Sequence, residues 1–210
     1  MDKTKIAVDI FNKYASSYQQ KFMDVSIYYD SFDLFCDYIK KENAQILELA
    51  CGPGNITKYL LNKRPDFKIL GTDLAPNMIE LAKLNNPKAE FELLDSRDIY
   101  SLKKKYDGIM CGFCLPYLTK EETQKLIQNS FRVLRPNGIL YISTMEDDYK
   151  KSGFRKGSQG DEIFMHYYEA EYLTKTLTEN QFKILKLDRK EYPAPDGSKV
   201  IDLILIAEKL

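Results

Sequence analysis

The chain lacks several features that would assign it to other classes of protein. Its 210 residues carry 31 basic and 31 acidic side chains, so the formal net charge is zero. Proteins that bind the phosphate backbone of nucleic acids usually carry a basic excess, which is missing here. The longest apolar runs, such as 203–207, have about five residues, whereas a membrane-spanning helix needs about 20. We therefore expect neither a nucleic-acid partner nor a membrane protein.

Tryptophan is absent and cysteine is scarce. Residues 1–11 mix charges into their apolar side chains and have no hydrophobic run, so no secretory signal peptide is predicted. The 4 cysteines are then expected to be reduced thiols in a cytoplasmic protein. Although Trp is missing, 15 Tyr and 11 Phe remain, and many of these rings must lie in the core or line a pocket. Nothing in the composition indicates an oligomeric state.

The spacing of apolar residues predicts a single α/β domain. Residues 1–44 have apolar positions at helical spacing. Beyond them, short apolar runs alternate with amphipathic stretches, which is typical of a parallel sheet with helices on both faces. Thr119 and Glu122 form a capping-box signature for one of these helices. Strands are predicted at 46–49, 68–72, 90–94, 108–111 and 139–143, and helices at 56–62, 77–84, 121–134 and 171–180.

The C-terminal end changes this pattern. Residues 182–192 and 199–209 are predicted to be two long strands, joined by the turn-rich segment 193–198. So short a connection requires an antiparallel pair. We therefore predict a Rossmann-like, seven-stranded, mostly parallel sheet with an antiparallel C-terminal strand. The polar stretch 145–165 is longer than a simple connection needs, and such long loops are usually functional or mobile.

A loop of small residues after the first predicted strand is the most informative segment. The strand 46–49 runs into the sequence ACGPGN (50–55), which opens a helix. Open α/β sheets bind ligands at the carboxyl ends of their strands. Gly52 and Gly54 allow the backbone to approach a ligand without interference from a Cβ atom. The loop is therefore predicted to bind a ligand.

Acidic residues near this loop favour a nucleoside without a pyrophosphate. Asp73 ends the second strand and suits the hydroxyls of a ribose, while Asp95 ends the third and can accept from the exocyclic amine of adenine. The third glycine of the dinucleotide motif G-x-G-x-x-G is replaced by Thr57, and no Walker lysine is present. Glu48, just before the loop, adds negative charge that suits a cationic amino group and repels phosphate.

These features, in this order, resemble class I S-adenosylmethionine-dependent methyltransferases of the small-molecule type. The resemblance runs from about residue 45 to the C-terminus. The sequence ELACGPGN matches the family's acid-x-G-x-G-x-G loop with Ala50 in place of the first glycine, which fits if the backbone φ of Ala50 is negative. The sequence RPNG (135–138) matches the family's turn before the fifth strand. The resemblance implies in-line transfer of a methyl group from S-adenosyl-L-methionine to a small-molecule acceptor, with S-adenosyl-L-homocysteine as product.

The resemblance also implies the site and its surroundings. Residues 1–44 take the place of an N-terminal helical lid, and 145–165 that of an insertion over the acceptor pocket. A metal-dependent catechol type would need an acid after the fourth strand, where the sequence CGFCL has none, so no metal is predicted. The expected cofactor-binding residues are Tyr18, Glu48, Ala50, Gly52, Gly54, Asn55, Asp73, Leu74, Met78, Asp95, Ser96, Cys111 and Phe113.

The acceptor side leaves alternatives open. His166, the only histidine, is either a general base or a structural imidazole. Tyr14 and Tyr18 lie one helical turn apart, where they either close over the methionine end of the cofactor or only pack; Tyr18 is the second catalytic candidate. Cys111 and Cys114 form a C-x-x-C pair that ends a strand and has no second pair of ligands. We therefore expect them beside the cofactor and not in a zinc or redox site.

Two other functions also remain open. The first is methylation of RNA or protein, which would use the same cofactor site. The second is a module that binds the cofactor without turnover, because the sequence shows no evident general base. Binding of the cofactor without methyl transfer to any metabolite of a broad panel would favour this second alternative.

Overall fold

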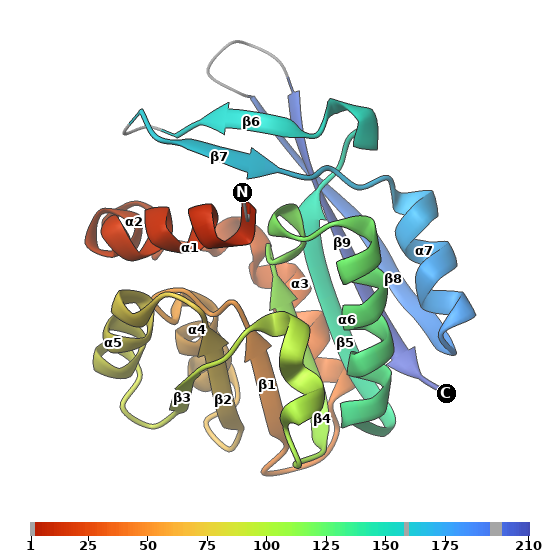
Figure 1. Cartoon of the computed structure of the whole chain (residues 1–210). Coiled ribbons are helices and arrows are strands. Elements are labelled where there is room, and N and C mark those ends of the chain that lie inside the picture. The colour runs from red at the N-terminus through yellow and green to blue at the C-terminus, as the bar shows by residue number, and fades with distance from the viewer. Residues whose placement is uncertain (1–2, 158–159, 194–198) are drawn as a thin grey trace.

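The computed structural model of the chain describes residues 3–157, 160–193 and 199–210. At its centre is a seven-stranded sheet with the order β3-β2-β1-β4-β5-β9-β8 (Figure 1). Its strands are β1 (Gln45–Leu49), β2 (Lys68–Asp73), β3 (Glu90–Leu93), β4 (Tyr106–Gly112), β5 (Leu134–Met145), β8 (Phe182–Pro193) and β9 (Lys199–Lys209). The strands from β3 to β5 pair in parallel, whereas β9 is antiparallel to both of its neighbours. The predicted sheet is confirmed; segment 194–198, part of the predicted connection, lies outside the described residues.

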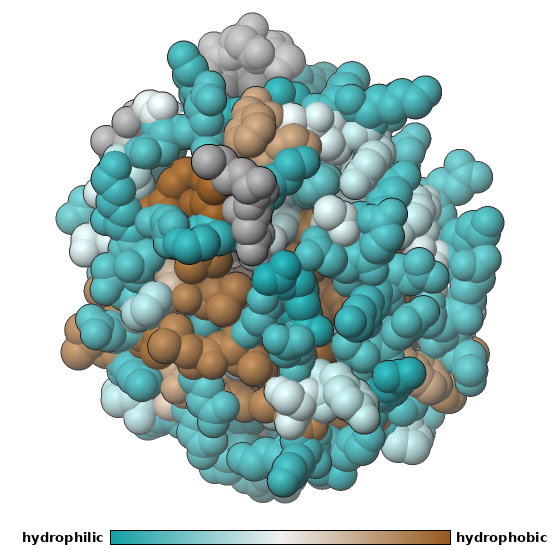
Figure 2. Space-filling view, in the orientation of Figure 1, coloured by the Kyte–Doolittle hydropathy of each residue, from teal (hydrophilic) through white to brown (hydrophobic). Residues whose placement is uncertain are grey.

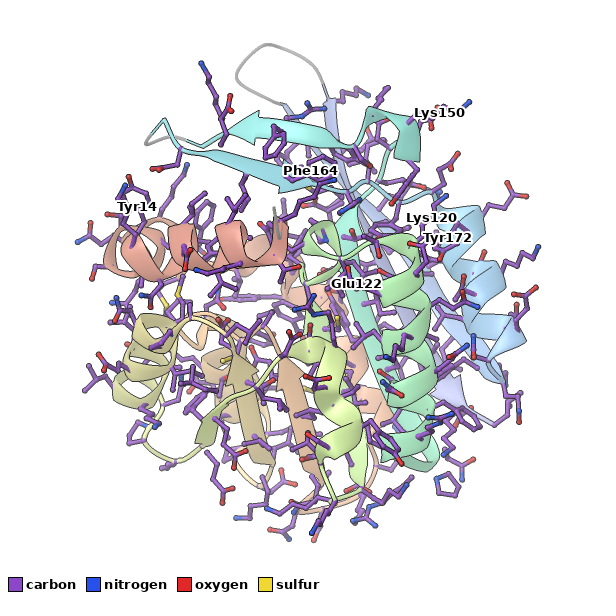
Figure 3. The ribbon with its side chains drawn as sticks, viewed as in Figure 1. Tyr14, Lys120, Glu122, Lys150, Phe164 and Tyr172 are labelled. Atoms are coloured by element: carbon purple, nitrogen blue, oxygen red, sulfur yellow. The ribbon has the colours of Figure 1, made fainter. Side chains whose placement is uncertain are left out.

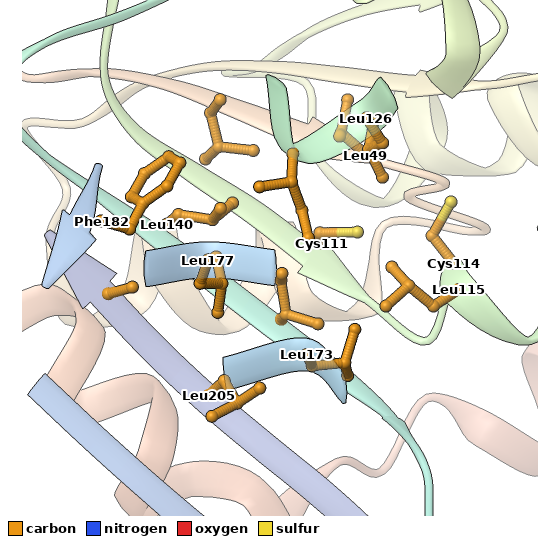
Figure 4. Packing of buried hydrophobic residues seen from close by; sticks show 14 of the residues in the cluster. Leu49, Cys111, Cys114, Leu115, Leu126, Leu140, Leu173, Leu177, Phe182 and Leu205 are labelled. Atoms are coloured by element: carbon orange, nitrogen blue, oxygen red, sulfur yellow. The ribbon is translucent and has the colours of Figure 1, made fainter. Parts of the chain in front are cut away.

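Helices cover both faces of the sheet because successive strand residues point to opposite sides. On β4, Ile109 and Cys111 pack with α6 and α7, whereas Met110 between them packs with α3 and α4 on the other face. Figure 4 shows part of the first of these clusters. The helices are α1 (Lys3–Lys13), α2 (Ala15–Phe22), α3 (Tyr29–Tyr38), α4 (Asn55–Lys63), α5 (Pro76–Asn85), α6 (Lys120–Val133) and α7 (Ala170–Glu179), with the 3-10 turns η1 (Ser26–Tyr28), η2 (Ser96–Ser101), η3 (Leu115–Tyr117) and η4 (Tyr149–Lys151). Each helix in the described part of the chain is too short or too polar to cross a bilayer.

Of the capping box and the turn that the sequence predicts at the two ends of α6, only the capping box forms as predicted. The capping box is present, because the Thr119 hydroxyl accepts from the Glu122 N–H at 3.2 Å and the Glu122 carboxylate accepts from the Thr119 N–H at 2.8 Å. The predicted turn 135–138 lies inside the bounds of β5, where the register against β4 shifts. Asn137 there has a φ of 59°, which asparagine tolerates better than most residues. The turn is therefore an irregularity within the strand.

Residues 1–44 divide into two parts. Helix α3 buries Phe32 and Phe35 against one face of the sheet and belongs to the core. Helices α1 and α2 lie across the carboxyl ends of the parallel strands instead (Figure 1). Within the segment 1–44 predicted as a lid, α3 therefore belongs to the core, whereas α1 and α2 lie over the strand ends.

The polar stretch 145–165 is not a simple loop. It contains an antiparallel pair, β6 (Gly153–Lys156) and β7 (Glu162–Met165), above α1 and α2 (Figure 1). The Lys3 Nζ lies 3.4 Å from the ring centroid of Phe164 on β7, and the Tyr14 hydroxyl donates to the Asp161 carboxylate at 2.5 Å. Figure 3 labels Phe164 and Tyr14. We call α1, α2, β6 and β7 together the roof.

Candidate functional site

A cavity, which we call the strand-end cavity, opens below the roof at the carboxyl ends of β1, β2 and β4. Hydrophobic side chains gather on the surface between β7 and α1 and again below α1 (Figure 2). The cavity is lined by Thr4, Ala7, Val8, Phe11, Tyr18, Ala50, Gly52, Asp73, Leu74, Ala75, Met78, Leu94, Asp95, Ser96, Gly112, Phe113, Cys114, Tyr117 and Leu118. Nine predicted cofactor residues are among them: Tyr18, Ala50, Gly52, Asp73, Leu74, Met78, Asp95, Ser96 and Phe113.

The loop after β1 takes a left-handed backbone at three positions. The φ angles are 51° at Ala50, 52° at Gly52 and 76° at Gly54. Glycine adopts such angles freely, whereas the Cβ atom of alanine is crowded there. The condition under which Ala50 would fit the loop, a negative φ, is therefore not met. Gly54 has a second reason to be glycine, since a Cβ atom on it would lie 2.4 Å from the Asn86 Nδ2 atom.

The Asp73 carboxylate is oriented by the loops on both sides of it. Its Oδ2 accepts from the Gly52 N–H at 2.9 Å and its Oδ1 accepts from the Ala75 N–H at 2.8 Å. Burial raises the pKa of Asp73, and these backbone donors oppose the rise. Each oxygen retains capacity for another hydrogen bond. Because the carboxylate also lines the cavity, it can accept two hydrogen bonds from a vicinal diol.

A second acidic position is fixed by an arginine that the sequence analysis missed. The Asp95 Oδ2 accepts from the Arg97 Nε at 2.9 Å and its Oδ1 accepts from the Arg97 N–H, also at 2.9 Å. Arg97 also donates to the Glu122 carboxylate at 2.9 Å. The Ser96 hydroxyl lies 3.3 Å from the Cys114 Sγ. This side of the cavity therefore presents acceptors in fixed positions.

Glu48 lies behind the loop and does not line the cavity. It is 1% exposed; the Thr57 hydroxyl donates to its Oε2, while its Oε1 has no partner among the described residues. Burial raises the pKa of Glu48 to about 8, although the bond from Thr57 opposes the rise, and the Asp73 charge adds to it. The carboxyl group is therefore mainly protonated near neutral pH.

Three further predicted residues also stand back from the lining. Gly54 shapes the loop, and the Asn55 side chain donates to the Phe22 carbonyl at 2.8 Å, which joins α2 to the start of α4. Cys111 is buried in the core beside Cys114 (Figure 4). Their contribution to the site is therefore indirect.

A second cavity of about 370 Å³, which we call the roof cavity, adjoins the first. The two linings share the rings of Phe11, Tyr18 and Tyr117. Phe11 packs edge-on against both tyrosines, with ring centroids 5.7 Å and 5.1 Å apart. The rest of the lining comes from the roof: Ile10, Tyr14, Ser17, Lys21, Phe22, Gly157, Asp161, Ile163 and Met165.

His166 is absent from both linings. It is 6% exposed, and its ring stacks on Tyr149 at 5.6 Å and packs on Phe164 at 4.8 Å. Its Nδ1 has no hydrogen-bond partner among the described residues, and burial lowers its pKa. These are the surroundings of a packed side chain, and they provide no support for the prediction of a general base.

Comparison with known proteins identifies the central part of the chain. Residues 46–138 match the family model described as a methyltransferase domain, and this segment contains the loop, both acids and the end of β4. This segment is similar to a methyltransferase domain. The resemblance to S-adenosylmethionine-dependent methyltransferases is therefore confirmed.

Relatives and solved structures agree with this methyltransferase domain. The chain is 36% identical over 101 residues to trans-aconitate 2-methyltransferase from Variovorax paradoxus (strain S110), covering 48% of this chain and 38% of that protein. It is 34% identical over 112 residues to malonyl-[acyl-carrier protein] O-methyltransferase from Acetivibrio thermocellus (strain ATCC 27405), covering 51% and 38%. The matched part thus spans less than half the length of these curated relatives.

The fold is shared over the whole chain. Magnesium protoporphyrin IX methyltransferase (ChlM) from Synechocystis PCC 6803, solved with bound SAM, superimposes with a TM-score of 0.73 at 16% identity. The superposition covers 100% of this chain and 98% of that one. The roof helices and the C-terminal strands therefore belong to the same fold as the methyltransferase domain.

Nine residues of the strand-end cavity were not predicted, and most come from segments without a motif. Those on α1 could have been noticed only as part of an apolar helical face. Those after β4 are close in sequence to Phe113, which was predicted, so this proximity could have indicated them. The unpredicted residues are Thr4, Ala7, Val8, Phe11, Ala75, Leu94, Gly112, Tyr117 and Leu118. Cys114, which was expected beside the cofactor, also lines the cavity.

Proposed function

We propose that this protein is an S-adenosyl-L-methionine-dependent methyltransferase that acts on a small-molecule acceptor. The observation that carries the proposal is the convergence of the loop 50–54, Asp73 and Asp95 on one cavity at the strand ends. All of these residues lie within the segment that matches the methyltransferase domain. The adjoining roof cavity of about 370 Å³ has the size of a small-molecule site.

The residues around the strand-end cavity fit the parts of this cofactor. Asp73 would hold the ribose hydroxyls, and Asp95 with Ser96 would face the adenine edge. The left-handed loop brings backbone close to the methionine part, and Gly52 leaves open space, because a Cβ atom on it would stay 3.8 Å from the Tyr18 ring. The cofactor supplies a methyl group on a cationic sulfur.

The contribution of the protein is alignment and the exclusion of water. Alignment of two reactants can lower a barrier by about 7–11 kcal/mol. The roof closes over the cavities through the contact of Tyr14 with Asp161 and that of Lys3 with Phe164. We propose that residues 1–210 act as one domain, in which the roof separates the acceptor from bulk water.

We also propose that the protein acts in the cytoplasm. All 4 cysteines are free and buried, and free thiols persist in reducing compartments. The net charge of zero gives no support for a nucleic-acid partner.

Titration calorimetry with S-adenosyl-L-homocysteine tests the proposed function. The wild type should bind this product and gain thermal stability from it, whereas NAD and ATP should give no shift. Asp73→Ala removes a charged acceptor of two hydrogen bonds and should weaken binding by about 10²-fold. Asp73→Asn should retain more affinity than Asp73→Ala.

Asp98→Ala is the matched control, because Asp98 is an exposed carboxylate near the cavity that does not line it. It should bind the product as the wild type does. Unchanged affinity in Asp73→Ala, or a preference for NAD, would contradict the proposal.

A further inference from the structure

The roof cavity has an apolar body. Ile10 and Phe22 from the helices and Ile163 and Met165 from β7 line it. Its volume of about 370 Å³ is at the lower end of the range for small-molecule sites. An occupant that buries most of its surface here must therefore be small and mainly apolar.

The charges at this cavity are not balanced. The Asp161 carboxylate is already engaged, because the Tyr14 hydroxyl donates to it at 2.5 Å and the Lys13 Nζ lies 3.5 Å from it. Lys21, which also lines the cavity, is exposed and has no salt-bridge partner among the described residues, and its Nζ lies 5.1 Å from the centroid of the Phe22 ring. No carboxylate of the described lining neutralises this positive charge, so it would attract an anion.

The wall between the two cavities supplies hydrogen-bond donors. The hydroxyls of Tyr18 and Tyr117 have no hydrogen-bond partner in the described part of the chain. Burial raises the pKa of Tyr18 to about 12 and raises that of Tyr117 as well. Both phenols therefore keep their protons near neutral pH and can donate to an anionic oxygen at the point where the cavities meet.

Within the described residues, the roof cavity also has no strong base that could take a proton from the acceptor. The hydrogen bond from Tyr14 holds the pKa of Asp161 below its usual range, so this carboxylate is a weak base. His166 lies outside the lining, and Cys114 lines only the strand-end cavity. An acceptor whose nucleophilic atom carries no proton, such as a carboxylate, therefore needs no base from the described lining.

We propose that the acceptor is a small carboxylic acid with an apolar body, bound in the roof cavity as its carboxylate. The proposal rests on the proposed function. A carboxylate oxygen attacks the methyl carbon, and the bond from this carbon to sulfur breaks with its electron pair going to sulfur. The products are a methyl ester and the neutral thioether, and no proton is released. Lys21 and the two phenols would hold the carboxylate, and the apolar walls would hold the remainder.

Binding to the protein saturated with S-adenosyl-L-homocysteine tests this assignment. Benzoate, cinnamate and octanoate should each bind at least about tenfold more tightly than their carboxamides, since the amide lacks the charge. Lys21→Gln should weaken the acids by about three- to tenfold and leave the affinity for the product unchanged. Lys58→Gln on α4, an exposed lysine that lines neither cavity, should change neither affinity.

Turnover with S-adenosyl-L-methionine gives an independent result. Methyl esters, identified by mass and by cleavage in alkali, are expected from the acids that bind. Equal binding of acids and amides, no effect of Lys21→Gln, or methylation of amines and phenols in preference to acids would overturn the acceptor class. Failure of the wild type to bind S-adenosyl-L-homocysteine would instead contradict the proposed function. The failure of the acceptor class and the failure of the proposed function can therefore be distinguished.

Discussion

Ala50 is the residue at which this loop departs from an optimal sequence for its backbone. It occupies the first glycine position of the family loop, yet its φ is 51°. An L-residue other than glycine pays about 1–2 kcal/mol for this conformation. The left-handed backbone at three positions places Ala50 and Gly52 in the lining of the cavity. The fold therefore keeps a strained residue where the site requires this backbone conformation.

Ala50→Gly is therefore expected to stabilise the protein. Relief of the crowded Cβ should exceed the entropy that glycine adds to the unfolded chain, for a net gain of about 0.5–1 kcal/mol in the free energy of unfolding. Urea unfolding followed by circular dichroism measures this change. Ala75 lines the same cavity with a φ of −90°, so Ala75→Gly should lower stability instead. A loss of stability in Ala50→Gly would contradict the argument.

Individual site residues differ in how well the sequence predicts them. Asp73 and Asp95 were found because each ends a strand, and parallel strands bring their ends to one edge. Phe11 and Tyr117 were missed because their contact joins segments about a hundred residues apart and depends on how the helix packs. The φ of Ala50 could not be read either, because the loop as a whole imposes it.

The elements of the roof also differ in how well the sequence predicts them. Helices α1 and α2 follow from their apolar spacing, but the hairpin β6–β7 does not, because its strands have four residues each and carry mixed charges. What fixes the hairpin is tertiary contact. The hydrogen bond from the Tyr14 hydroxyl to Asp161 and the packing of Lys3 on Phe164 attach it to the helices.

Tyr14→Phe should loosen this attachment without unfolding the protein. Removing a hydroxyl that donates to a carboxylate costs about 1–2 kcal/mol locally. Amide hydrogen exchange in 162–165, followed by mass spectrometry, should become about tenfold faster. Tyr59→Phe is a matched control, because the Tyr59 hydroxyl donates to Asp33 at 2.6 Å between α4 and α3. Equal acceleration in both variants, or none in Tyr14→Phe, would show that this bond does not hold the hairpin.

At the scale of the whole molecule, the sheet was the most predictable feature. Connection lengths decide which strands pair in parallel, and the short link before β9 requires the antiparallel pair. Burial of ionisable groups within this sheet is less evident from sequence. Glu48 on β1 is almost fully buried, and the residues around it include Thr57 on α4 and Asp73 on β2, which come from two other elements.

Glu48 makes the stability of the whole protein depend on pH. Its pKa rises from 4.5 to about 8 on folding, so between these values the folded state binds more protons than the unfolded state. The stabilisation is fully present below about pH 4.5 and is lost as the pH rises toward 8. The loss amounts to roughly 5 kcal/mol at most. The pKa of Asp66 is instead lowered to about 2 by Arg64, so its contribution to stability is lost as the pH falls toward 2.

Glu48→Gln keeps the shape of the side chain and removes its titration. The difference in unfolding free energy between this variant and the wild type should therefore grow in favour of the variant from pH 5 to pH 8, by about 2–4 kcal/mol. Urea unfolding at pH 5, 6, 7 and 8 measures the difference at each step. Glu80→Gln on α5, at an exposed glutamate, should run parallel to the wild type over the same range. If Glu48→Gln ran parallel as well, Glu48 would be ionised in the folded protein throughout, and its carboxylate would need a partner that burial alone does not supply.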